Sequence, residues 1–391
     1  MGQNKVILIG GDHYNGLALV RLFGKQGLKP YGIIVGQRAD IGFLKASRYW
    51  KKSWTVKDDS EILTVLRENF AGESETPVII PYSDGAAATI DNNLKELKDA
   101  FIVPSINGLQ SRIYEMMDKG KQVSFAEQCG LQMAKSYEIN LDDRNSVKEI
   151  EYPCIGKPVV SCEGDKTDIK RIDSQVELEQ YLIYLREKGY EKILLQKYVQ
   201  IDAEYDIEGF IHQNDSTYFV SEKVRTWPNI GGPTSYSFSI DNPTLNREID
   251  KIVDYLRDIG YSGLFDVEIF RVGKEYLFNE INWRNSAVCF AASASDVYYP
   301  WYWYCAVTNQ TYAIRNPDDY GVRAMNELLD FRHVKAKDVG LFRWVKQLWQ
   351  SEAYAYCDMT DMAPLCKRIW MSVKSFFLRI KNERRNSCQG D

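Results

Sequence analysis

Short apolar runs alternate with amphipathic segments through the first hundred residues, and this alternation restricts the fold more than any other feature of the chain. The predicted strands and helices are, in chain order, 5–9, 15–26, 30–35, 61–70, 78–81 and 84–97. Asp84 is expected to cap the last of these helices. Strands that alternate with helices form a parallel, doubly wound sheet, and such a sheet binds ligands at the carboxyl ends of its strands.

From Asp118 the pattern changes to that of an α+β body. The predicted helices there are 119–129, 174–188 and 243–259, and the predicted strands are 154–160, 167–171, 193–198, 205–211, 217–223, 234–239, 262–271 and 275–282. We therefore expect three regions, which are an α/β domain at 1–117, a body at 118–308 with lobes at 118–195 and 196–308, and a helical C-terminal extension at 309–391.

The composition excludes several classes of protein. Lysine and arginine number 49 against 54 acids, and a net charge of −5 argues against bulk nucleic-acid binding. The eight cysteines show no CxxC spacing, which favours a reducing cytoplasm over a disulfide framework or a zinc ribbon. The most apolar window, 287–307, contains Asp296 and Pro300, which disfavours a membrane span. The strand-like run from Val6 leaves little room for a signal peptide before it.

Two acid-bearing strands, predicted at 262–271 and 275–282, carry the most specific chemical pattern. Alternate side chains of a strand share one face, so Glu280, Asn282 and Arg284 point the same way. If the two strands form a hairpin, Glu268 lies beside Glu280. Two carboxylates and an amide oxygen then form an oxygen-only site of the kind that binds Mg²⁺ shared with phosphates. The alternative is a solvated polar sheet face with surface ion pairs.

Several cations precede these strands. Lys157 lies on a strand that should be buried, where an anionic partner such as phosphate would stabilise it. Lys119 begins a helix, and Lys223 and Arg225 alternate on one strand, which gives a second basic face. For each of these cations the alternative is an ordinary solvated surface position.

The ordered set of these segments resembles the ATP-grasp superfamily. The segments are Asp118-Lys119, Pro153–Pro158 with Lys157, Leu195–Val199, Glu204, Lys223-Val224-Arg225, Glu268 and Glu280–Arg284. The resemblance covers about residues 1–295, and it is greatest to the carboxylate–amine ligases of that superfamily, the group that includes D-aspartate ligase. It implies an α/β domain followed by an α+β body whose two lobes hold ATP between them.

The resemblance also implies the groups that bind nucleotide and metal. Two lysines would hold the α- and β-phosphates, a segment joining the lobes would bind adenine, and an acid would bind ribose. The lysines are Lys119 and Lys157. The adenine would contact Gln196 and the backbone of Lys197 and Val199. The ribose would bind Glu204, with Asp202 as the alternative. The Mg²⁺ ligands, which would also accept Mn²⁺, are Glu268, Glu280 and Asn282.

The remaining implied groups belong to the transfer step. Arg284, with Lys223 and Arg225, would stabilise the γ-phosphate and an acyl phosphate. The loop of Gly10, Gly11 and Asp12 would lie near the substrate. The loop expected to cover the phosphates, 161–166, has the single glycine Gly164, fewer than many relatives have.

The resemblance implies a ligase that transfers the γ-phosphate of ATP to a carboxylate, after which an amine displaces phosphate. Phosphoryl transfer of this kind needs positive charge rather than a protein nucleophile. Only three histidines occur, without HExxH, and neither GxGxxG nor a P-loop is present. An amino acid is the expected carboxylate, with a cell-envelope or polysaccharide precursor as amine acceptor. The alternatives are a ligase of free dipeptides or small metabolites, and a non-catalytic nucleotide-binding regulator.

The C-terminal extension leaves two interpretations open. The segment 364–385 is predicted to be a helix with an apolar stripe and a basic face. It would either lie on an anionic membrane surface at the inner face of the membrane or pack its stripe against the body. Likewise, the aromatic run 298–304 would either line an acceptor site or pack in the core or between the subunits of a homo-oligomer.

Overall fold

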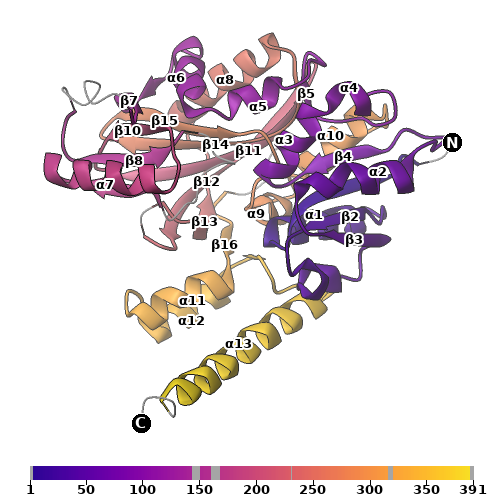
Figure 1. The fold of residues 1–391 in the computed structure, drawn as a ribbon. Coiled ribbons are helices and arrows are strands. Elements are labelled where there is room, and N and C mark those ends of the chain that lie inside the picture. The colour runs from indigo at the N-terminus through magenta and orange to yellow at the C-terminus, as the bar shows by residue number, and fades with distance from the viewer. Residues whose placement is uncertain (1–2, 143–149, 160–167, 230, 316–319, 388–391) are drawn as a thin grey trace.

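Figure 1 shows the chain as a set of three sheets surrounded by helices, with a long C-terminal helix projecting from one end. The computed structural model describes residues 3–142, 150–159, 168–229, 231–315 and 320–387, with side chains as far as residue 375. The strand orders are β3-β2-β1-β4, β7-β10-β8-β9 and β17-β16-β13-β12-β11-β14-β15-β6, and β5 pairs with β14. The predicted boundaries between regions, at 117/118 and 308/309, stay predictions.

The first sheet is entirely parallel. Its strands are β1 (Val6–Gly11), β2 (Tyr31–Val35), β3 (Lys52–Val56) and β4 (Val78–Pro81). Successive β1 residues pack to opposite sides, since Leu8 joins the cluster of α1 (Tyr14–Lys25) and Ile9 that of α2 (Ile62–Phe70) and α3 (Asp84–Asn92). The doubly wound prediction is therefore confirmed, and β3 is an edge strand for which no prediction was made.

The start of α3 differs from the prediction by one residue. Ser83 is the N-cap and accepts a hydrogen bond from the Ala86 N–H, so Asp84 is the first residue of the helix. A hydroxyl satisfies this helix end, which leaves the Asp84 carboxylate available for a contact elsewhere. The helix also ends early, at Asn92, and the short α4 (Leu94–Leu97) follows.

The second sheet is antiparallel. Its strands are β7 (Ser136–Asn140), β8 (Cys154–Pro158), β9 (Lys170–Ile172) and β10 (Lys192–Lys197). α7 (Gln175–Glu187) covers one face, where Tyr181 approaches Gly156 so closely that a Cβ there would lie 2.3 Å from the ring. Because side chains alternate along β8, Lys157 points to the opposite face.

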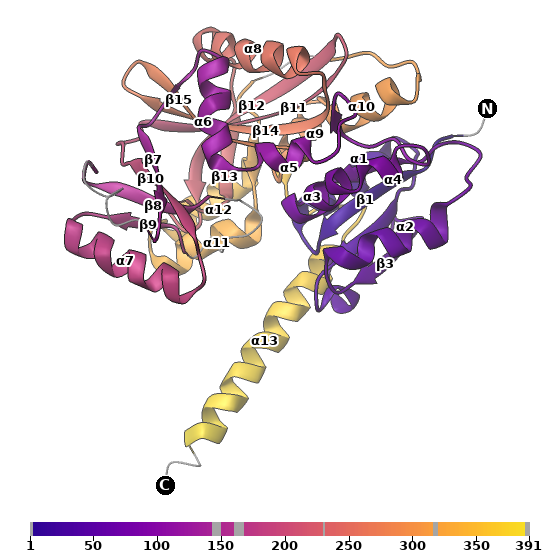
Figure 2. The same cartoon turned by 45° about the horizontal axis from the view of Figure 1, so that its top comes forward.

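The third sheet is the largest. Its strands are β5 (Ser105–Ile106), β6 (Gln132–Met133), β11 (Ala203–His212), β12 (Asp215–Thr226), β13 (Thr234–Ser239), β14 (Tyr261–Val272), β15 (Glu275–Asn282), β16 (Arg323–Met325) and β17 (Ala353–Tyr354). On one face Ile207, Val267 and Ile269 pack against α8 (Pro243–Asp258). The other face carries the charged residues of the same strands, and Figure 2 shows the second sheet beside this one.

The other helices complete the fold. They are α5 (Arg112–Met116), α6 (Lys119–Gln128), α9 (Cys289–Ala294), α10 (Tyr299–Val307), α11 (Glu327–Ala336), α12 (Leu341–Trp349) and α13 (Ala363–Ser387), with single 3₁₀ turns at Ala39–Ile41, Leu44–Ala46 and Asp59–Glu61. Most aromatic residues of 298–304, including Tyr299, Trp303 and Tyr304, are buried, which favours the core interpretation. Among the described helices, none is long and apolar enough to cross a bilayer.

The region after residue 308 is not purely helical, because β16 and β17 extend the third sheet. The same region is also fastened to the first domain. The Asp361 carboxylate accepts hydrogen bonds from Arg21, Ser47 and the Arg48 N–H. The C-terminal region therefore ties the first sheet to the third.

Candidate active site

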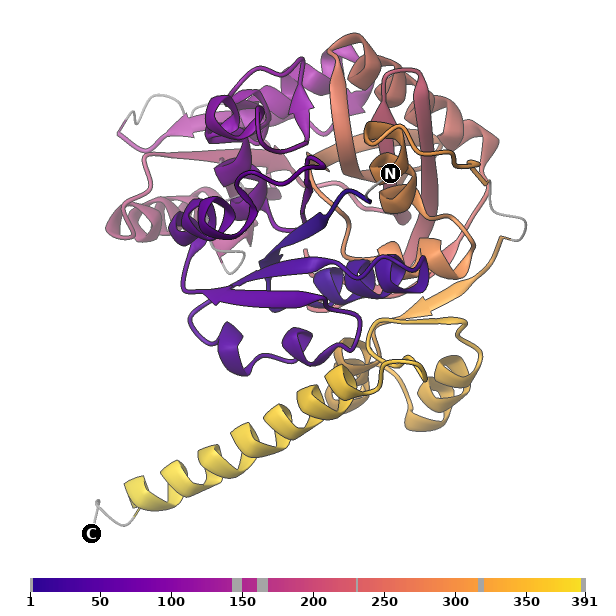
Figure 3. The ribbon, with the colours of Figure 1, turned by 90° about the vertical axis from the view of Figure 1, so that its right-hand side faces the viewer.

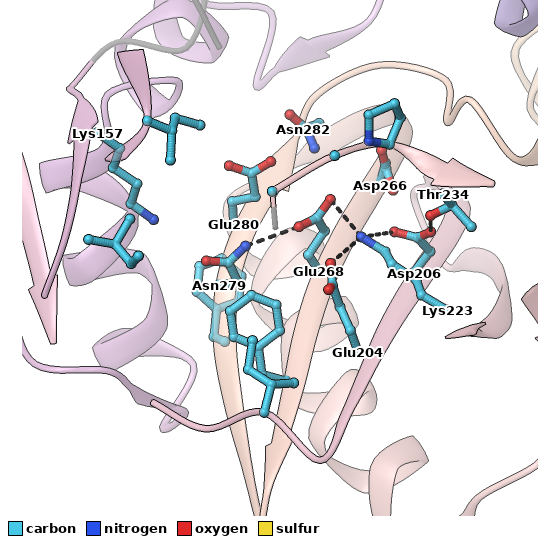
Figure 4. A pocket seen from close by; sticks show the side chains of 18 of the residues that line it. Lys157, Glu204, Asp206, Lys223, Thr234, Asp266, Glu268, Asn279, Glu280 and Asn282 are labelled. Atoms are coloured by element: carbon cyan, nitrogen blue, oxygen red, sulfur yellow. Dashed lines mark hydrogen bonds and ion pairs between the residues drawn. The ribbon is translucent and has the colours of Figure 1, made fainter. Parts of the chain in front are cut away.

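A cavity of about 480 Å³ lies between the second and third sheets, a size typical of small-molecule sites. We name its two sides by their residues. The lysine wall consists of Lys119, Lys157 and Gln196, and the acidic wall of Glu204, Asp206, Asp266, Glu268 and Glu280. Figure 4 shows Lys157 reaching from the second sheet toward Glu280 on the third.

The predicted hairpin of acid-bearing strands is present. β14 and β15 pair antiparallel, and Glu268 stands directly opposite Glu280. A bulge after Glu268 turns Asn279 inward, where its Nδ2 donates a 3.0 Å hydrogen bond to Glu268 Oε2. Asn282 lies opposite Asp266 and lines the same cavity. The two carboxylates and the amide that sequence reasoning selected as metal ligands are therefore neighbours.

The donor set fits a divalent cation that is shared with a ligand. Burial raises the pKa of Glu268 to about 8, an effect opposed by Lys223 and reinforced by Glu280. A cation beside this pair would favour both carboxylates in their charged form. Within the described part of the chain, no three acidic, histidine or cysteine side chains gather closely enough to hold a metal alone. Oxygen ligands from a phosphate would have to complete the shell, as is usual for Mg²⁺.

Lys223 on β12 forms the centre of the acidic wall. Its side chain is 4% exposed, and its Nζ bonds to Glu204 and lies 3.0 Å from Asp206 and 3.1 Å from Glu268 (Figure 4). Burial alone would lower the pKa of Lys223, but these carboxylates raise it well above the ordinary value. The ammonium therefore links Glu204, the predicted ribose ligand, to Glu268, the predicted metal ligand.

The lysine wall has the opposite character. Lys157 is buried, and its Nζ donates a 3.1 Å hydrogen bond to Gln196 Oε1, while Gln196 Nε2 donates to Ser136 Oγ. Burial lowers the pKa of Lys157 to about 8, and nearby Lys119 lowers it further against the pull of Glu280 and Glu268. No acid among the described residues lies within ion-pair distance of Lys157 or Lys119. Two neighbouring cations that pair with no acid in the described ranges suit an anionic ligand.

Asp118 explains how Lys119 reaches the wall. Its carboxylate caps α6 by accepting hydrogen bonds from the N–H groups of Gly120 and Lys121. Lys119 is thereby held as the first residue of the helix and is buried.

Arg284 lies where the acidic wall meets the first domain. Its Nε donates to Asp84 Oδ1 at 3.0 Å, and its Nη1 donates to Asp266 Oδ2 at 2.7 Å. Asp84 comes from α3, so this contact joins the third sheet to the first domain beside the cavity. The planar fork of arginine suits such a double contact and fixes where the guanidinium points.

The segment that is predicted to join the lobes begins at the end of β10. Lys197 and Val199 line the cavity together with Gln196 and Glu204. The N–H groups of Lys197 and Tyr198 are bonded to the carbonyls of Lys135 and Pro153. Asp202, the alternative ribose ligand, instead accepts from the Gly273 N–H at the β14–β15 turn. Of the two acids, Glu204 is the one that faces the cavity.

Arg225 is not brought into the cavity. A bulge in the β12–β13 pairing lies between Lys223 and Arg225, so the simple alternation that predicted a shared face fails there. Arg225 instead forms a two-pronged contact with Asp330 on α11, through Nε at 2.9 Å and Nη2 at 2.7 Å.

The loop of Gly10, Gly11 and Asp12 also lies outside the residues that line the cavity. The Asp12 carboxylate accepts hydrogen bonds from the N–H groups of Phe43 and Leu44, and Tyr82 Oη donates to the Gly10 carbonyl. These contacts give the loop a role within the first domain. The predicted phosphate-covering loop, 161–166, lies outside the described residues.

Sequence reasoning missed several acids of the cavity. Asp206 is two residues after Glu204, and Asp266 is two residues before Glu268, so both share a face with a predicted ligand. The same period places Glu208 deeper on this face, where complete burial raises its pKa well above the ordinary value. Strict period-two extension along β11 and β14 would have found all three.

No family model matches. The chain is 25% identical over 217 residues, 54% of each protein, to the formate-dependent phosphoribosylglycinamide formyltransferase of Actinobacillus pleuropneumoniae. It is 24% identical over 278 residues, 68% of each protein, to the enzyme of that name from Mannheimia succiniciproducens. The chain thus spans about half the length of several curated relatives that it matches.

Solved structures extend the likeness over most of the chain. An ADP complex of N5-carboxyaminoimidazole ribonucleotide synthetase superimposes with a TM-score of 0.66 at 14% identity, covering 86% of each chain. The Staphylococcus aureus N5-carboxyaminoimidazole synthetase with ADP gives 0.64 at 16% identity, covering 86% of this chain and 87% of that one. The L-amino acid ligase of Bacillus licheniformis gives 0.60 at 14% identity, covering 79% and 74%. The likeness is one of fold.

Proposed function

We propose that this chain, which has the ATP-grasp fold, is an ATP- and Mg²⁺-dependent ligase that joins a carboxylate to an amine. The observation that supports this most is the composition of the two cavity walls. Glu268 and Glu280 face buried Lys157 across one cavity, so that metal-binding oxygens and phosphate-binding cations meet.

In this proposal the nucleotide binds between the walls. Lys119 and Lys157 hold phosphate oxygens, and the segment at Gln196, Lys197 and Val199 contacts the adenine. Glu204 binds the ribose. Glu268, Glu280 and Asn282 would hold Mg²⁺, which when bound neutralises the charge that builds up on the phosphates.

The reaction has two steps. A substrate carboxylate attacks the γ-phosphate of ATP, which yields an acyl phosphate and ADP. An amine then attacks the acyl carbon, phosphate leaves, and the nitrogen loses a proton as the amide forms. Arg284, held by Asp84 and Asp266, stabilises the phosphoryl oxygens during both steps. Lys223 keeps Glu204 and Glu268 in place.

The substrates divide into two classes. In the first class an amino acid is the carboxylate and a cell-envelope or polysaccharide precursor is the amine. The basic C-terminal extension supports this class, because a basic helix can bind an anionic membrane surface. The second class is a small metabolite pair, including formate with a ribonucleotide amine, and the names of the curated relatives favour it. A cytoplasmic location, peripheral to the inner face of the membrane, is part of the first. Both substrate classes are compatible with a homo-oligomer.

A non-catalytic nucleotide-binding regulator is the remaining candidate. It would not need metal-binding oxygens that face the phosphate site. The presence of Glu268, Glu280 and Asn282 together on one wall therefore weighs against it.

The test is an ADP-release screen of the full-length protein with ATP and Mg²⁺. Carboxylates are supplied as an amino-acid panel plus formate, each with and without candidate amines, and Glu280→Gln serves as the inactive control. ADP release that requires both a carboxylate and an amine supports the ligase. ATP binding without ADP release from any pair contradicts it and favours the regulator.

A further inference from the structure

α12 carries an apolar stripe that faces away from the protein. The stripe consists of Leu341, Phe342, Val345 and Trp349, and all four side chains are exposed. Phe342 is 92% exposed and Trp349 is 85% exposed, although aromatic residues of this size are normally buried. On the inward side Trp344 stacks edge-on against Phe331 of α11, with ring centroids 5.1 Å apart. Trp344 thus packs inward, while the four apolar side chains of the stripe are exposed on the same helix.

The charged residues of α12 itself are all positive, while the exposed acids Asp338 and Glu352 lie just outside its two ends. Arg343 and Lys346 are exposed on α12, which contains no acid, and Lys335 and Lys337 are exposed just before it. The pattern continues on α13, where Ile369, Trp370 and Val373 are exposed beside Lys374. Residues 327–391 hold twelve lysines and arginines against eight acids, whereas the whole chain has a net charge of −5. Positive charge is therefore concentrated in this region.

α11, α12 and the start of α13 lie at one end of the molecule. Figures 1 and 3 are related by a turn about the vertical axis, and both place these helices below the sheets. A single extended surface can therefore approach α12 from that end without passing over the first or second sheet.

We propose that α12 docks on an anionic lipid bilayer. The stripe enters the boundary between headgroups and acyl chains, and Arg343 and Lys346 contact the anionic headgroups. The proposal does not depend on the ligase activity. A symmetric dimer through the same face is disfavoured, because a two-fold axis would bring Arg343 and Lys346 close to the same residues of the second copy.

The test is cosedimentation of the full-length protein with vesicles of equimolar phosphatidylcholine and phosphatidylglycerol, compared with phosphatidylcholine alone. We expect binding to the anionic vesicles that weakens as salt is added. The double substitution Phe342→Ser with Trp349→Ser should reduce the partition coefficient about 10-fold or more, as expected when two aromatic anchors are lost. Arg343→Gln with Lys346→Gln should remove the preference for anionic vesicles.

The matched control is Val176→Ser with Ile183→Ser on α7, two apolar side chains that are also exposed. This control should bind vesicles as the natural protein does. Because the substituted α12 side chains are exposed, the melting temperature should stay unchanged in the Phe342/Trp349 double and in the Arg343/Lys346 double. Absence of vesicle binding by the natural protein, or equal binding by the Phe342/Trp349 double, would overturn the proposal. A dimer in sedimentation equilibrium that the same double abolishes would also overturn it, since a second copy would then cover the stripe.

Discussion

Two buried lysines stand on opposite walls of one cavity in opposite surroundings. Lys157 donates a hydrogen bond to the amide oxygen of Gln196, and burial lowers its pKa to about 8. Lys223 is enclosed by three carboxylates, which raise its pKa well above the ordinary value although burial alone would lower it. The same residue type is therefore a destabilised charge on the lysine wall and a stabilised charge on the acidic wall.

The difference indicates the charge of the ligand that each wall would bind. On the lysine wall positive charge is in excess, so an anion stabilises it. On the acidic wall carboxylates outnumber cations, and burial together with the neighbouring Glu280 raises the pKa of Glu268 despite the opposing effect of Lys223. A nucleotide with a divalent cation supplies both missing charges at once, because its phosphates face one wall and its metal faces the other.

The largest effect is expected from Glu280→Gln. It keeps the shape of the side chain but removes one charged metal ligand, so turnover should fall by about 1,000-fold or more, since a catalytic metal supplies several kcal/mol. ADP release measures it. Glu275→Gln, at the exposed start of the same strand, is the matched control and should keep full activity. Unchanged turnover in Glu280→Gln would remove the metal assignment.

Lys223→Met should cause the largest loss of stability. It leaves Glu204, Asp206 and Glu268 without their shared ammonium, and removal of one partner of a buried ion pair costs about 3–5 kcal/mol. The loss should shrink as the pH is lowered, because protonated carboxyls no longer need the cation. Urea unfolding measures it, with Lys274→Met in the exposed β14–β15 turn as the control. A loss of unfolding free energy no larger than that of the control would contradict the role of Lys223 as the shared partner of the three carboxylates.

Lys157→Met should act in the opposite direction on the ligand-free protein and should weaken nucleotide binding. Loss of one contact to a charged group, about 1.5–3 kcal/mol, weakens ADP binding by about 10- to 100-fold. Without nucleotide, however, the variant should be more stable at neutral pH, because it lacks a buried ammonium that no described acid pairs with. Calorimetric titration and urea unfolding measure these changes, and exposed Lys170→Met is the control.

The pH dependence of the same lysine has a definite sign. The pKa of Lys157 is about 8 in the folded protein and is higher in the unfolded chain, so between these values the unfolded state binds more protons. The stability contributed by this group therefore rises with pH above about 8. Lys157→Met should lack this rise. An identical pH profile in both proteins would show that Lys157 is not the titrating group.

The smallest effect on the cavity is expected from Arg225→Gln. Because Arg225 bonds to Asp330 outside the cavity, ADP affinity should change by less than about twofold, as is usual when a substitution lies far from the binding site. Asp330 would keep its hydrogen bond from Ser235 but lose its ion pair, which should lower the free energy of unfolding by about 1–3 kcal/mol. The melting temperature should therefore fall. A large loss of ADP affinity would return Arg225 to the site that the sequence predicted.

Much of the site was predictable because it depends on local periodicity. The β14–β15 pairing and the face shared by Glu280 and Asn282 follow from strands with a period of two. The expected alternation of Lys223 and Arg225 fails because a bulge interrupts that period. Asp84 was predicted as a helix cap, but Ser83 fills that position and Asp84 bonds to Arg284, which is 200 residues away.

The order of residue types along the chain was sufficient for the alternating α/β domain, the two acid-bearing strands and the buried lysine, because these depend on neighbours within a few residues. The partners of the charges depended on tertiary structure. Distances across sheets decide which carboxylates surround Lys223 and why no carboxylate of the described residues pairs with Lys157. They also decide that α12 exposes Phe342 and Trp349. Electrostatic energy depends on separation in space and on burial, and neither quantity can be read from separation along the chain.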